Sequence, residues 1–387
     1  MSDKFSPIPA KQLLEIILKE LDTHGTVFGY PSELFFNPNQ GKLPTTIFGQ
    51  TIDTPIGVAA GPHTQLAHNI VIAWLMGARY LELKTIQTLD ELEIAKPCID
   101  MQDEGYNCEW SQELRVEESF MEYLKAWVII HILNHKLQLG SKPNMVFNMS
   151  VGYNLEGIKK PNVQWFLNKM GNATDELNQM VQELKAIYPA IGNIDIHAKL
   201  SDNITLSTMH GCPANEIEDI ARYLLTERRL HTLVKLNPTL LGSSELRETL
   251  NNKLRFKTNV PDIAFEHDLK YPDALKLIEA LSAEAKTLNL TFGVKLTNTL
   301  ESVNNKHVFP SEVDMMYMSG RALHPISINL ARKLQNDFKG QLLLSFSAGV
   351  DAFNVSKVMG CGFRTVTVSS DLLKPGGYGR LKQYIDN

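Results

Sequence analysis

The chain is poor in cysteine, and its four cysteines include no C-x-x-C pair. Cys98, Cys108, Cys212 and Cys361 are scattered over a chain of 387 residues, which is too long to need disulfides for stability. Iron–sulfur clusters and structural zinc commonly use closely spaced cysteines. The sequence therefore argues against a disulfide scaffold and an iron–sulfur motif, and we expect a cytoplasmic protein in a reducing environment.

The chain also lacks a long apolar run and a large excess of charge of either sign. The longest apolar run, residues 126–133, is interrupted by His131 and is far too short to span a bilayer. Residues 1–21 have apolar side chains at helical spacing among charges, which predicts an amphipathic helix and not a signal peptide. A net charge of −5 gives no reason to expect nucleic acid or an anionic membrane as a partner.

No G-x-G-x-x-G follows the first predicted strand, so an open dinucleotide-binding sheet is the less favoured fold. Short β-branched runs alternate with helical stretches. Strands are predicted over residues 56–60, 80–84, 145–149, 204–206, 232–236, 292–296, 342–346 and 365–368. Helices are predicted over residues 69–76, 117–133, 163–187, 214–225, 274–288, 326–335 and 355–359. Eight strands with intervening helices predict an α/β protein, a (β/α)8 TIM barrel.

Three connections are longer than usual, at residues 85–116, 238–271 and 297–321. The loops that follow barrel strands lie on the catalytic face, so we expect this extra chain to form a lid and a substrate pocket. No boundary in the sequence demands a second domain. We therefore expect one barrel domain over residues 1–387, with an N-terminal helical extension of about residues 1–50.

The stretch Ser207-Thr-Met-His-Gly-Cys-Pro213 is the strongest local signal. It follows an apolar run and precedes the helical pattern at 214–225, which predicts that Cys212 lies on a turn between a strand and a helix. Pro213 suits the first helical position, and a helix N-terminus lowers the pKa of a nearby thiol. Cys212 is thus a candidate for proton exchange with a bound ligand. The alternative is a buried cysteine that only packs.

The predicted strands end in polar or small residues. Ala59-Ala-Gly-Pro62 would let a flat ligand approach the backbone closely. Lys84, Lys235 and Lys295 each follow apolar strand residues, which predicts a site for an anion or an electron-rich ring. The alternative for each lysine is a solvated charge on the rim.

Two late loops have features of a phosphate site. Ser347-Ala-Gly-Val350 is expected to open a helix with its backbone N–H groups outward, and Ser369 and Ser370 add hydroxyl donors. Barrels commonly hold phosphate after their seventh and eighth strands. No metal site is predicted, because His63, His210 and Cys212 match no zinc spacing.

Several strings resemble the flavin barrels of the dihydroorotate dehydrogenase superfamily. They are Pro55-Ile-Gly-Val-Ala-Ala-Gly61, Leu83-Lys-Thr85, Gly211-Cys-Pro213, Val234-Lys-Leu-Asn-Pro238, Thr297-Asn-Thr299, Ser319-Gly-Arg-Ala322 and Ser347-Ala-Gly-Val-Asp351. The chain is similar to the FMN domain of dihydropyrimidine dehydrogenase. It is more similar to the N-terminal domain of the bacterial family named putative selenate reductase, through Ala59-Ala-Gly-Pro-His-Thr-Gln-Leu-Ala67, Phe147-Asn-Met-Ser-Val-Gly-Tyr-Asn-Leu-Glu-Gly157 and Asp371-Leu-Leu-Lys-Pro-Gly-Gly377.

This resemblance implies a bound FMN and a role for each matching residue. Residues implied to contact FMN are Ala59, Ala60, Gly61, Lys84, Thr85, Asn148, Lys235, Thr297, Gly320, Ala348, Gly349, Ser369 and Ser370. Among them Lys235 would lie near N1 and C2 of the ring, and Gly349, Ser369 and Ser370 would hold the phosphate. Residues implied to contact the substrate are His63, Asn107, Asn154, Asn298 and Thr299. Cys212 would be the general acid/base while hydride passes to or from flavin N5.

The resemblance predicts an FMN-dependent oxidoreductase that transfers two electrons to or from a C=C or C=N bond of a nitrogen heterocycle. The pyrimidine enzymes have an Asn where this chain has Met209, so a pyrimidine substrate is not inferred. Members of the resembling family are often associated with purine breakdown, which makes a purine-type ring the first expectation. Longer members of the family continue into electron-transfer parts, which implies a partner with FAD or iron–sulfur clusters, and a homo- or hetero-oligomer stays open. The alternatives are a Schiff-base lyase that uses Lys84, Lys235 or Lys295, and a non-catalytic flavin subunit that only relays electrons.

Overall fold

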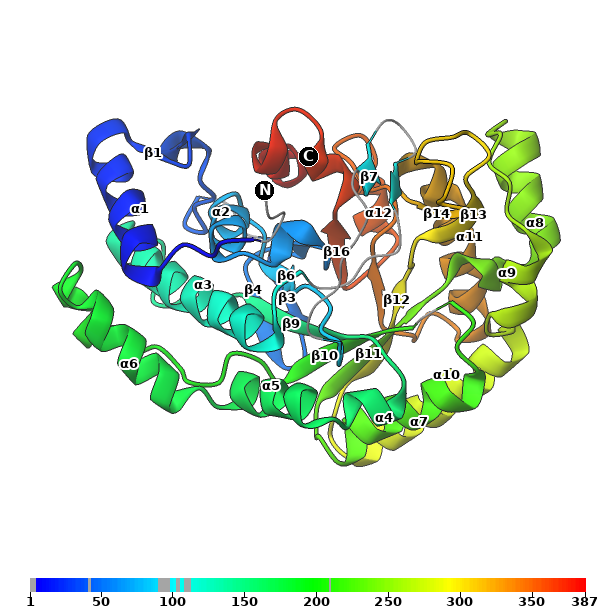
Figure 1. The fold of residues 1–387 in the computed structure, drawn as a ribbon, viewed down its shortest axis with the longest axis horizontal. Helices are drawn as coiled ribbons and strands as arrows, with labels where there is room; N and C mark the ends of the chain where they lie inside the picture. The colour runs from blue at the N-terminus through cyan, green and yellow to red at the C-terminus, as the bar shows by residue number, and fades with distance from the viewer. Residues whose placement is uncertain (1–4, 41–42, 90–97, 102–104, 108–112, 209) are drawn as a thin grey trace.

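The eight predicted barrel strands are all present in the computed structural model, which describes residues 5–40, 43–89, 98–101, 105–107, 113–208 and 210–387 (Figure 1). The strands are β5 (Ile56–Val58), β6 (Tyr80–Glu82), β9 (Val146–Val151), β10 (Asn203–Ser207), β11 (His231–Leu236), β12 (Phe292–Leu296), β15 (Leu344–Phe346) and β16 (Thr365–Val368). They form a closed parallel barrel in the order β10-β11-β12-β15-β16-β5-β6-β9. The prediction of a TIM barrel is therefore confirmed.

The helices around the barrel begin and end close to the predicted positions, with one exception. They are α2 (Ala67–Leu75), α3 (Val116–Lys136), α7 (Ala214–Thr226), α10 (Tyr271–Thr287), α11 (Leu323–Asp337) and α12 (Val355–Gly360). The single helix predicted over residues 163–187 is wrong, because the chain forms α5 (Pro161–Gly171) and α6 (Thr174–Leu184). Between them the Asn172 side chain accepts hydrogen bonds from the Thr174 backbone N at 3.1 Å and from the Thr174 hydroxyl at 2.6 Å. Asparagine competes with helical hydrogen bonding in this way.

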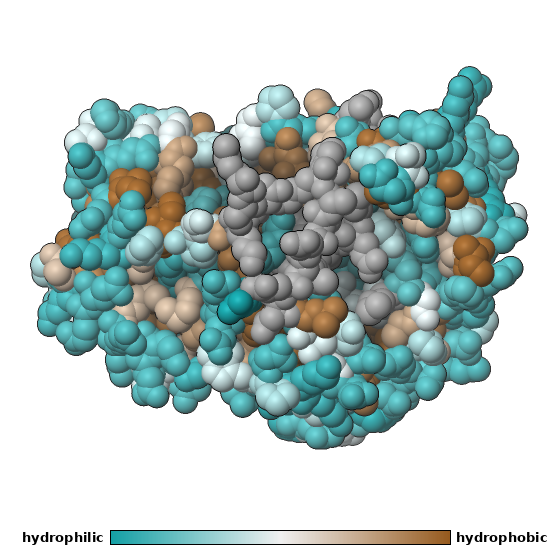
Figure 2. Space-filling model, viewed as in Figure 1, coloured by the Kyte–Doolittle hydropathy of each residue, from teal (hydrophilic) through white to brown (hydrophobic). Residues whose placement is uncertain are grey.

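The longest apolar run of the sequence lies in α3 and is buried inside the protein. This helix packs against α2 and α5, and Val128, Ile129 and Ile130 have no exposed surface. No helix among the described residues is both long enough and apolar enough to cross a membrane. On the face seen in Figure 2, hydrophobic residues lie in small separate groups among hydrophilic ones.

The N-terminal segment combines a helix with two hairpins. Helix α1 (Ala10–His24) begins after Pro9, buries Leu13, Leu14 and Ile17, and packs against α6. The hairpins are β1–β2 (Thr26–Val27, Tyr30–Pro31) and β3–β4 (Thr45–Ile47, Gln50–Ile52). The second hairpin places Ile47, Phe48 and Ile52 against Tyr80, Val146 and Leu233 of the barrel strands. Because Tyr80 and Val146 begin their strands, this hairpin covers the amino-terminal end of the barrel.

Two of the long loops contain strands that the sequence did not predict. Strands β7 (Ile99–Asp100) and β8 (Tyr106–Asn107) follow β6, whereas β13 (Leu300–Val303) and β14 (Met315–Met318) follow β12. They form a four-stranded antiparallel sheet in the order β13-β14-β8-β7, although β7 and β13 are far apart in the sequence (Figure 1). The pairing of Asn107 with Tyr317 joins the two loops at the carboxyl end of the barrel.

The remaining long loop, residues 238–271, and the other connections contain short helical elements. The α-helices are α4 (Leu155–Ile158), α8 (Ser243–Arg247), α9 (Asp262–His267) and α13 (Arg380–Asp386). The 3-10 turns are η1 (Ser32–Leu34), η2 (Pro62–Thr64), η3 (Pro189–Asn193), η4 (Pro238–Leu241), η6 (Gly320–Ala322), η7 (Ser370–Leu373) and η8 (Gly377–Gly379), and η5 (Glu248–Lys253) is a π-helix.

Candidate active site

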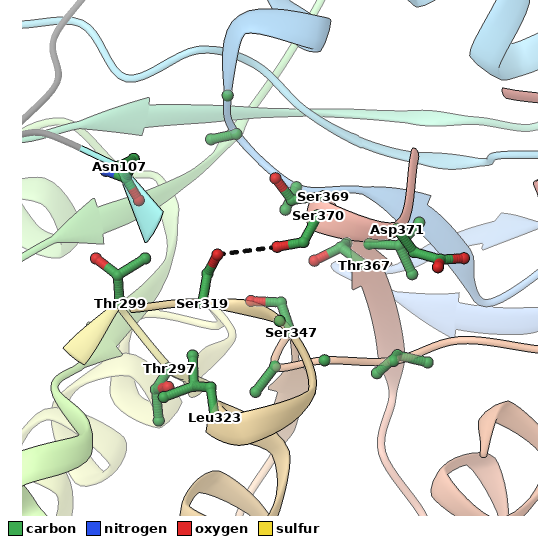
Figure 3. Close-up of a pocket in the computed structure, with 18 of the residues that line it drawn as sticks. Asn107, Thr297, Thr299, Ser319, Leu323, Ser347, Thr367, Ser369, Ser370 and Asp371 are labelled. Atoms are coloured by element: carbon green, nitrogen blue, oxygen red, sulfur yellow. Dashed lines mark hydrogen bonds between the residues drawn. The ribbon is translucent and has the colours of Figure 1, made fainter. Parts of the chain in front are cut away.

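A cavity of about 220 Å³ opens where the carboxyl ends of the barrel strands meet, and we name it the main cavity. Every residue implied to contact FMN lines it except Asn148. Asn107 and Thr299, implied to contact the substrate, also line it. In Figure 3 their side chains lie on one side of the cavity, and Ser369 and Ser370 lie on the other. The structure thus brings together residues from both halves of the chain.

Small residues form one wall of the main cavity. Ala59, Ala60 and Gly61 follow β5, and the Ala60 backbone N donates to Glu82 Oε2 at 3.2 Å. The Gly61 N donates to the Thr64 hydroxyl at 3.1 Å. A Cβ atom at Gly61 would lie 2.9 Å from the His63 ring, so this wall has no room for a larger side chain.

At the other end of the main cavity, two loops approach each other through their backbones. Gly349 has a φ of +58°, and a Cβ atom there would lie 2.2 Å from the Gly320 carbonyl oxygen. Ser370 Oγ donates to Ser319 Oγ at 3.0 Å beside this contact (Figure 3). Glycine is needed because L side chains disfavour this conformation and the neighbouring backbone leaves no space.

The loop after β15 does not open a helix directly, so that expectation is wrong. Helix α12 begins only at Val355. In between, Asp351 Oδ1 accepts from the Phe353 N at 2.9 Å and Asn354 Oδ1 accepts from the Asp351 N at 3.0 Å. These side chain–backbone hydrogen bonds form a turn before the helix. The polar groups at this end of the main cavity are therefore loop backbone and loop side chains, and not the N-terminus of a helix.

Lys84 and Lys235 line the main cavity, and both have lowered pKa values. Burial, followed by the charge of Lys295, lowers the pKa of Lys235 to about 8. Burial lowers the pKa of Lys84 to about 7, with Glu113 opposing the shift and Lys235 adding to it. Among the described residues, the Lys235 ammonium group has no hydrogen-bond or ion-pair partner. It is therefore available to a ligand in the main cavity.

Lys295 lies inside the barrel and does not line the main cavity, so the expectation that it faces a ligand is wrong. Its side chain is fully buried and forms an ion pair with Glu82. Its Nζ also donates to Thr367 Oγ1 at 2.7 Å. The sequence could not predict this pairing, because Glu82 and Lys295 come from strands on opposite sides of the barrel.

Asn148 is buried below the main cavity and does not reach it. Its Nδ2 donates to Asn203 Oδ1 at 2.8 Å, and its Oδ1 accepts from the Thr205 hydroxyl at 2.6 Å. Both ends of the amide are therefore used by β10.

A second cavity of about 170 Å³ lies beside the main cavity and contains Cys212, so we name it the cysteine cavity. Ser207 lines both cavities, and Asn154 lines the cysteine cavity. Cys212 is half-buried on the turn between β10 and α7, as predicted, although Pro213 precedes the first helical residue and is not part of the helix.

Asp268 holds the turn that contains Cys212. Its Oδ1 accepts from the Gly211 backbone N at 2.8 Å and from Asn237 Nδ2 at 3.1 Å. Its Oδ2 accepts from the Thr239 hydroxyl at 2.6 Å and lies 3.4 Å from His210 Nδ1. Sequence reasoning missed Asp268, because it belongs to the long loop after β11 and no motif marks it.

The expected lowering of the Cys212 pKa is wrong. Burial, and then the charges of Glu216 and Asp268, raise the pKa of this thiol to about 11. The two carboxylates and the loss of water outweigh the favourable end of α7. At neutral pH the thiol is therefore protonated.

Two residues implied to contact the substrate line neither cavity. Asn298 Nδ2 donates to the Thr208 carbonyl at 2.9 Å and to Asn237 Oδ1 at 2.8 Å, so it braces the loops around the site. His63 is buried, and neither ring nitrogen has a hydrogen-bond partner within the described part of the chain. Burial, with the charge of Lys84, lowers the pKa of His63 to about 4, so the ring is neutral at pH 7.

Other polar residues line the main cavity without having been predicted individually. They are Ser207, Ser319, Arg321, Ser347, Asp351, Thr367, Asp371 and Lys374. Arg321 and Asp371 are engaged by the fold, because Arg321 Nε lies 2.9 Å from Asp351 Oδ2 and Arg380 Nε donates to Asp371 Oδ2 at 2.8 Å. Within the described part of the chain, no group of three or more His, Cys, Asp or Glu residues could hold a metal ion.

A closed parallel barrel with a polar cavity at its carboxyl end defines a TIM-barrel protein with its site in the usual place. Residues 28–387 match the family model described as the N-terminal TIM-barrel domain of oxidoreductase YgfK, and the chain belongs to this family.

Two curated relatives and one solved structure extend this comparison. The chain is 46% identical over 406 aligned residues to "Putative oxidoreductase YgfK" of Escherichia coli strain K12 and, equally, of Escherichia coli O157:H7. The alignment covers 98% of this chain but only 39% of each relative. A ligand-free dihydroorotate dehydrogenase from Eimeria tenella shares the fold, with a TM-score of 0.51 and 16% identity over 89% of this chain and 86% of that one. The names of these proteins do not mention selenate.

Proposed function

We propose that this chain is the FMN-binding domain of an oxidoreductase that acts on a nitrogen heterocycle. The main support is the construction of the main cavity, with a flat wall of small residues, an unpartnered lysine and a cradle of glycine backbone and serine hydroxyls. A ligand with a flat ring and a phosphate at its far end would match these features, because the ring would lie on the wall and the phosphate in the cradle. The donor types in the main cavity therefore fit FMN.

The residues in the main cavity divide into those for the ring and those for the phosphate. Ala59, Ala60 and Gly61 would pack on the ring, and Lys235 would donate to its polar edge. The Gly349 backbone and the Ser370 hydroxyl would bind the phosphate. When bound, FMN supplies two-electron transfer to or from the substrate.

Cys212 is the proposed proton donor to the substrate. The thiol is protonated at neutral pH, and Asp268 holds its turn through the Gly211 backbone N. Ser207 is shared by the two cavities, so a ring in the main cavity would lie close to the turn that contains Cys212. General acid–base catalysis needs such a positioned donor within reach of the reacting atom.

The proposed substrate is a purine-type heterocycle with a C=C or C=N bond that gains or loses two electrons. Asn107 and Thr299 offer an amide and a hydroxyl group in the main cavity, and Asn154 offers an amide in the cysteine cavity. Such groups can bind ring N–H and C=O groups. The resemblance to pyrimidine-reducing barrels supports the class of ring and not the particular compound.

The electrons are proposed to come from, or go to, a part of the protein or a partner that holds FAD or iron–sulfur clusters. The chain spans about two fifths of the length of the curated relatives it matches, and electron-transfer groups in the remainder would serve this purpose. Mixing FMN-loaded protein with NADH or NADPH tests this proposal. Slow reduction that a candidate partner accelerates is expected, and fast reduction of this chain alone would contradict it.

The decisive test of the proposed function is reconstitution with FMN followed by a substrate screen without oxygen. We expect the protein to take up one FMN without a covalent bond. After chemical reduction, a substrate should restore the oxidised flavin spectrum, and it should do so much more slowly when Cys212 is replaced by Ala. Failure to bind FMN would reject the proposal, and FMN binding with no response to any heterocycle would favour an electron-relay subunit.

A Schiff-base lyase is the second candidate, because the lowered pKa values of Lys84 and Lys235 would make either amine a nucleophile near neutral pH. Reduction with borohydride in the presence of a carbonyl substrate would trap such an enzyme covalently. Trapping at Lys84 or Lys235 in protein that binds no flavin would favour the lyase.

A further inference from the structure

We infer that the buried Glu82–Lys295 pair is a positioning device that sets the protonation of Lys235, the unpartnered lysine of the main cavity. The inference rests on the proposed function only for the identity of the ligand that Lys235 meets. Glu82 and Lys295 touch no ligand themselves, since neither lines the main cavity.

The pair spans the interior of the barrel directly below the main cavity. In the ring of eight strands, β12 and β6 are four positions apart in both directions, so their inward side chains meet across the barrel. Lys295 is 0% exposed and Glu82 is 2% exposed. Thr367 of β16 connects this pair to the main cavity. Its hydroxyl accepts a hydrogen bond from Lys295 Nζ at 2.7 Å, and Thr367 lines the main cavity.

Lys235 is next to this pair in the sheet. It is in register with Lys295 on the adjacent parallel strands β11 and β12, so both side chains leave the sheet on the same face. Two ammonium groups placed in this way repel each other, and the repulsion is strong where water is excluded. The charged groups around Lys235 are Lys295, Glu82 and Lys84, of which Lys295 and Lys84 oppose its charge and Glu82 favours it.

Glu82 also fixes the wall of small residues. Its Oε2 accepts from the Ala60 backbone N at 3.2 Å, while its other oxygen is paired with Lys295. One carboxylate therefore holds the position of the wall and balances the charge below Lys235. Loss of either partner of such a buried pair leaves a charge without compensation.

Replacement of Lys295 by Met gives the clearest test, because each of its electrostatic effects on Lys235 favours the protonated amine. The repulsion disappears, and Glu82 becomes free to attract Lys235. The pH at which Lys235 is half protonated, about 8 in the native protein, should rise by about one unit or more. Labelling of Lys235 by an amine-reactive reagent at pH 8, followed by mass spectrometry of FMN-free protein, should slow about fivefold or more.

A second variant covers the case in which Lys295→Met does not fold. The double variant Glu82→Gln/Lys295→Met removes both charges, keeps the side-chain volumes, and keeps an acceptor for the Ala60 N–H. Neutral replacements of a buried ion pair are commonly tolerated. The midpoint of Lys235 should also rise in this variant, but by less, because the attraction of Glu82 is lost as well.

The chain offers a matched control in the Glu122–Lys125 pair of α3. This pair is also buried, and Glu122 Oε2 accepts from the Ala67 backbone N at 2.7 Å, but the pair lies outside the barrel. Lys125→Met should leave the labelling of Lys235 unchanged. A midpoint of Lys235 that stays at about 8 in both barrel variants, or that shifts equally in the control, would overturn the inference.

The same variants in FMN-loaded protein give a second measurement. The pH at which the slope of the flavin midpoint potential changes should move upward together with the labelling midpoint. If the native protein takes up no FMN, the proposed function fails, yet the labelling of FMN-free protein still decides the inference. If FMN binds and Lys295→Met changes neither measurement, only the inference fails.

Discussion

The main cavity and the cysteine cavity lie side by side at one end of the barrel, but different parts of the chain build them. The main cavity is lined by residues at the ends of many barrel strands, from Ala59 after β5 to Ser370 after β16. The cysteine cavity is lined mainly by residues of β10, the turn after it and α7. The main cavity is lined mostly by the ends of the barrel strands together with loop residues such as Asn107 and Ser319, whereas the turn of the cysteine cavity is held by Asp268 from a distant loop.

This difference predicts that the functions of the two cavities can be separated by mutation. Cys212→Ala should leave FMN binding intact and slow turnover by about 10²–10⁴-fold, the usual contribution of general acid–base catalysis. Steady-state rates and FMN titrations of the same protein provide the measurement. Cys212→Ser should lie between, because a hydroxyl is a poorer acid at neutral pH. Full activity of the alanine variant would rule out this role, and loss of FMN would show that the cavities are not separable.

Gly349→Asp should show the opposite pattern, because it should weaken FMN binding directly. A side chain there meets the Gly320 carbonyl oxygen and adds a negative charge where the phosphate is proposed to bind. Backbone strain and charge repulsion together should weaken FMN binding by about a hundredfold or more, measured by fluorescence titration. Gly340→Asp is the matched control, because Gly340 also has a positive φ but no atom near its Cβ position. Unchanged affinity in Gly349→Asp would remove this loop from the phosphate site.

His63 makes the wall of the main cavity sensitive to acid. Its folded pKa of about 4 lies below the ordinary value of 6.5, so the unfolded chain binds more protons between these pH values. The contribution of His63 to the free energy of unfolding is therefore fully present above pH 6.5. It is lost as the pH drops toward 4, by about 3 kcal/mol in total.

Urea unfolding at pH 8 and pH 5 tests this prediction. His63→Leu should keep the stability at pH 8, since neither ring nitrogen has a hydrogen bond to any of the described residues, and should lessen the loss of stability at pH 5. His131 has a similarly low pKa, but its Nδ1 donates a hydrogen bond to the Trp127 carbonyl oxygen at 2.7 Å, so His131→Leu should also destabilise the protein at pH 8. An equal loss on acidification in native protein and His63→Leu would contradict the prediction.

Asp268→Asn should have the smallest effect and act on the cysteine cavity alone. The charge of Asp268 raises the pKa of Cys212, so its removal should lower that pKa from about 11 by up to about one unit. The rate of Cys212 alkylation against pH, followed by mass spectrometry, measures the shift, and FMN affinity should not change. Glu216→Gln is the comparison, because it removes the other nearby carboxylate without touching the turn. A lower FMN affinity in Asp268→Asn would show that Asp268 also supports the main cavity.

The sequence predicts features that depend on periodicity and on local motifs. The eight strands could be recognised because buried parallel strands are short β-branched runs between turn residues. The position of Cys212 followed from the turn between an apolar run and a helical pattern, and Lys84 and Lys235 were placed by the ends of their strands. The division of the helix predicted over 163–187 was missed, because one Asn side chain ended it.

Features that depend on contacts between distant strands were decided only by the tertiary structure. From the sequence, Lys295 was predicted to face the ligand in the same way as Lys235. In the structure, Lys295 instead forms a buried ion pair with Glu82, which comes from the opposite side of the barrel. The sequence predicted a lowered pKa for Cys212 from the helix that follows it, but burial and two carboxylates raise that pKa. Local sequence determines where a strand ends and which side chain stands there. The protonation and direction of that side chain depend on the charges and on the loss of water that the closed barrel imposes.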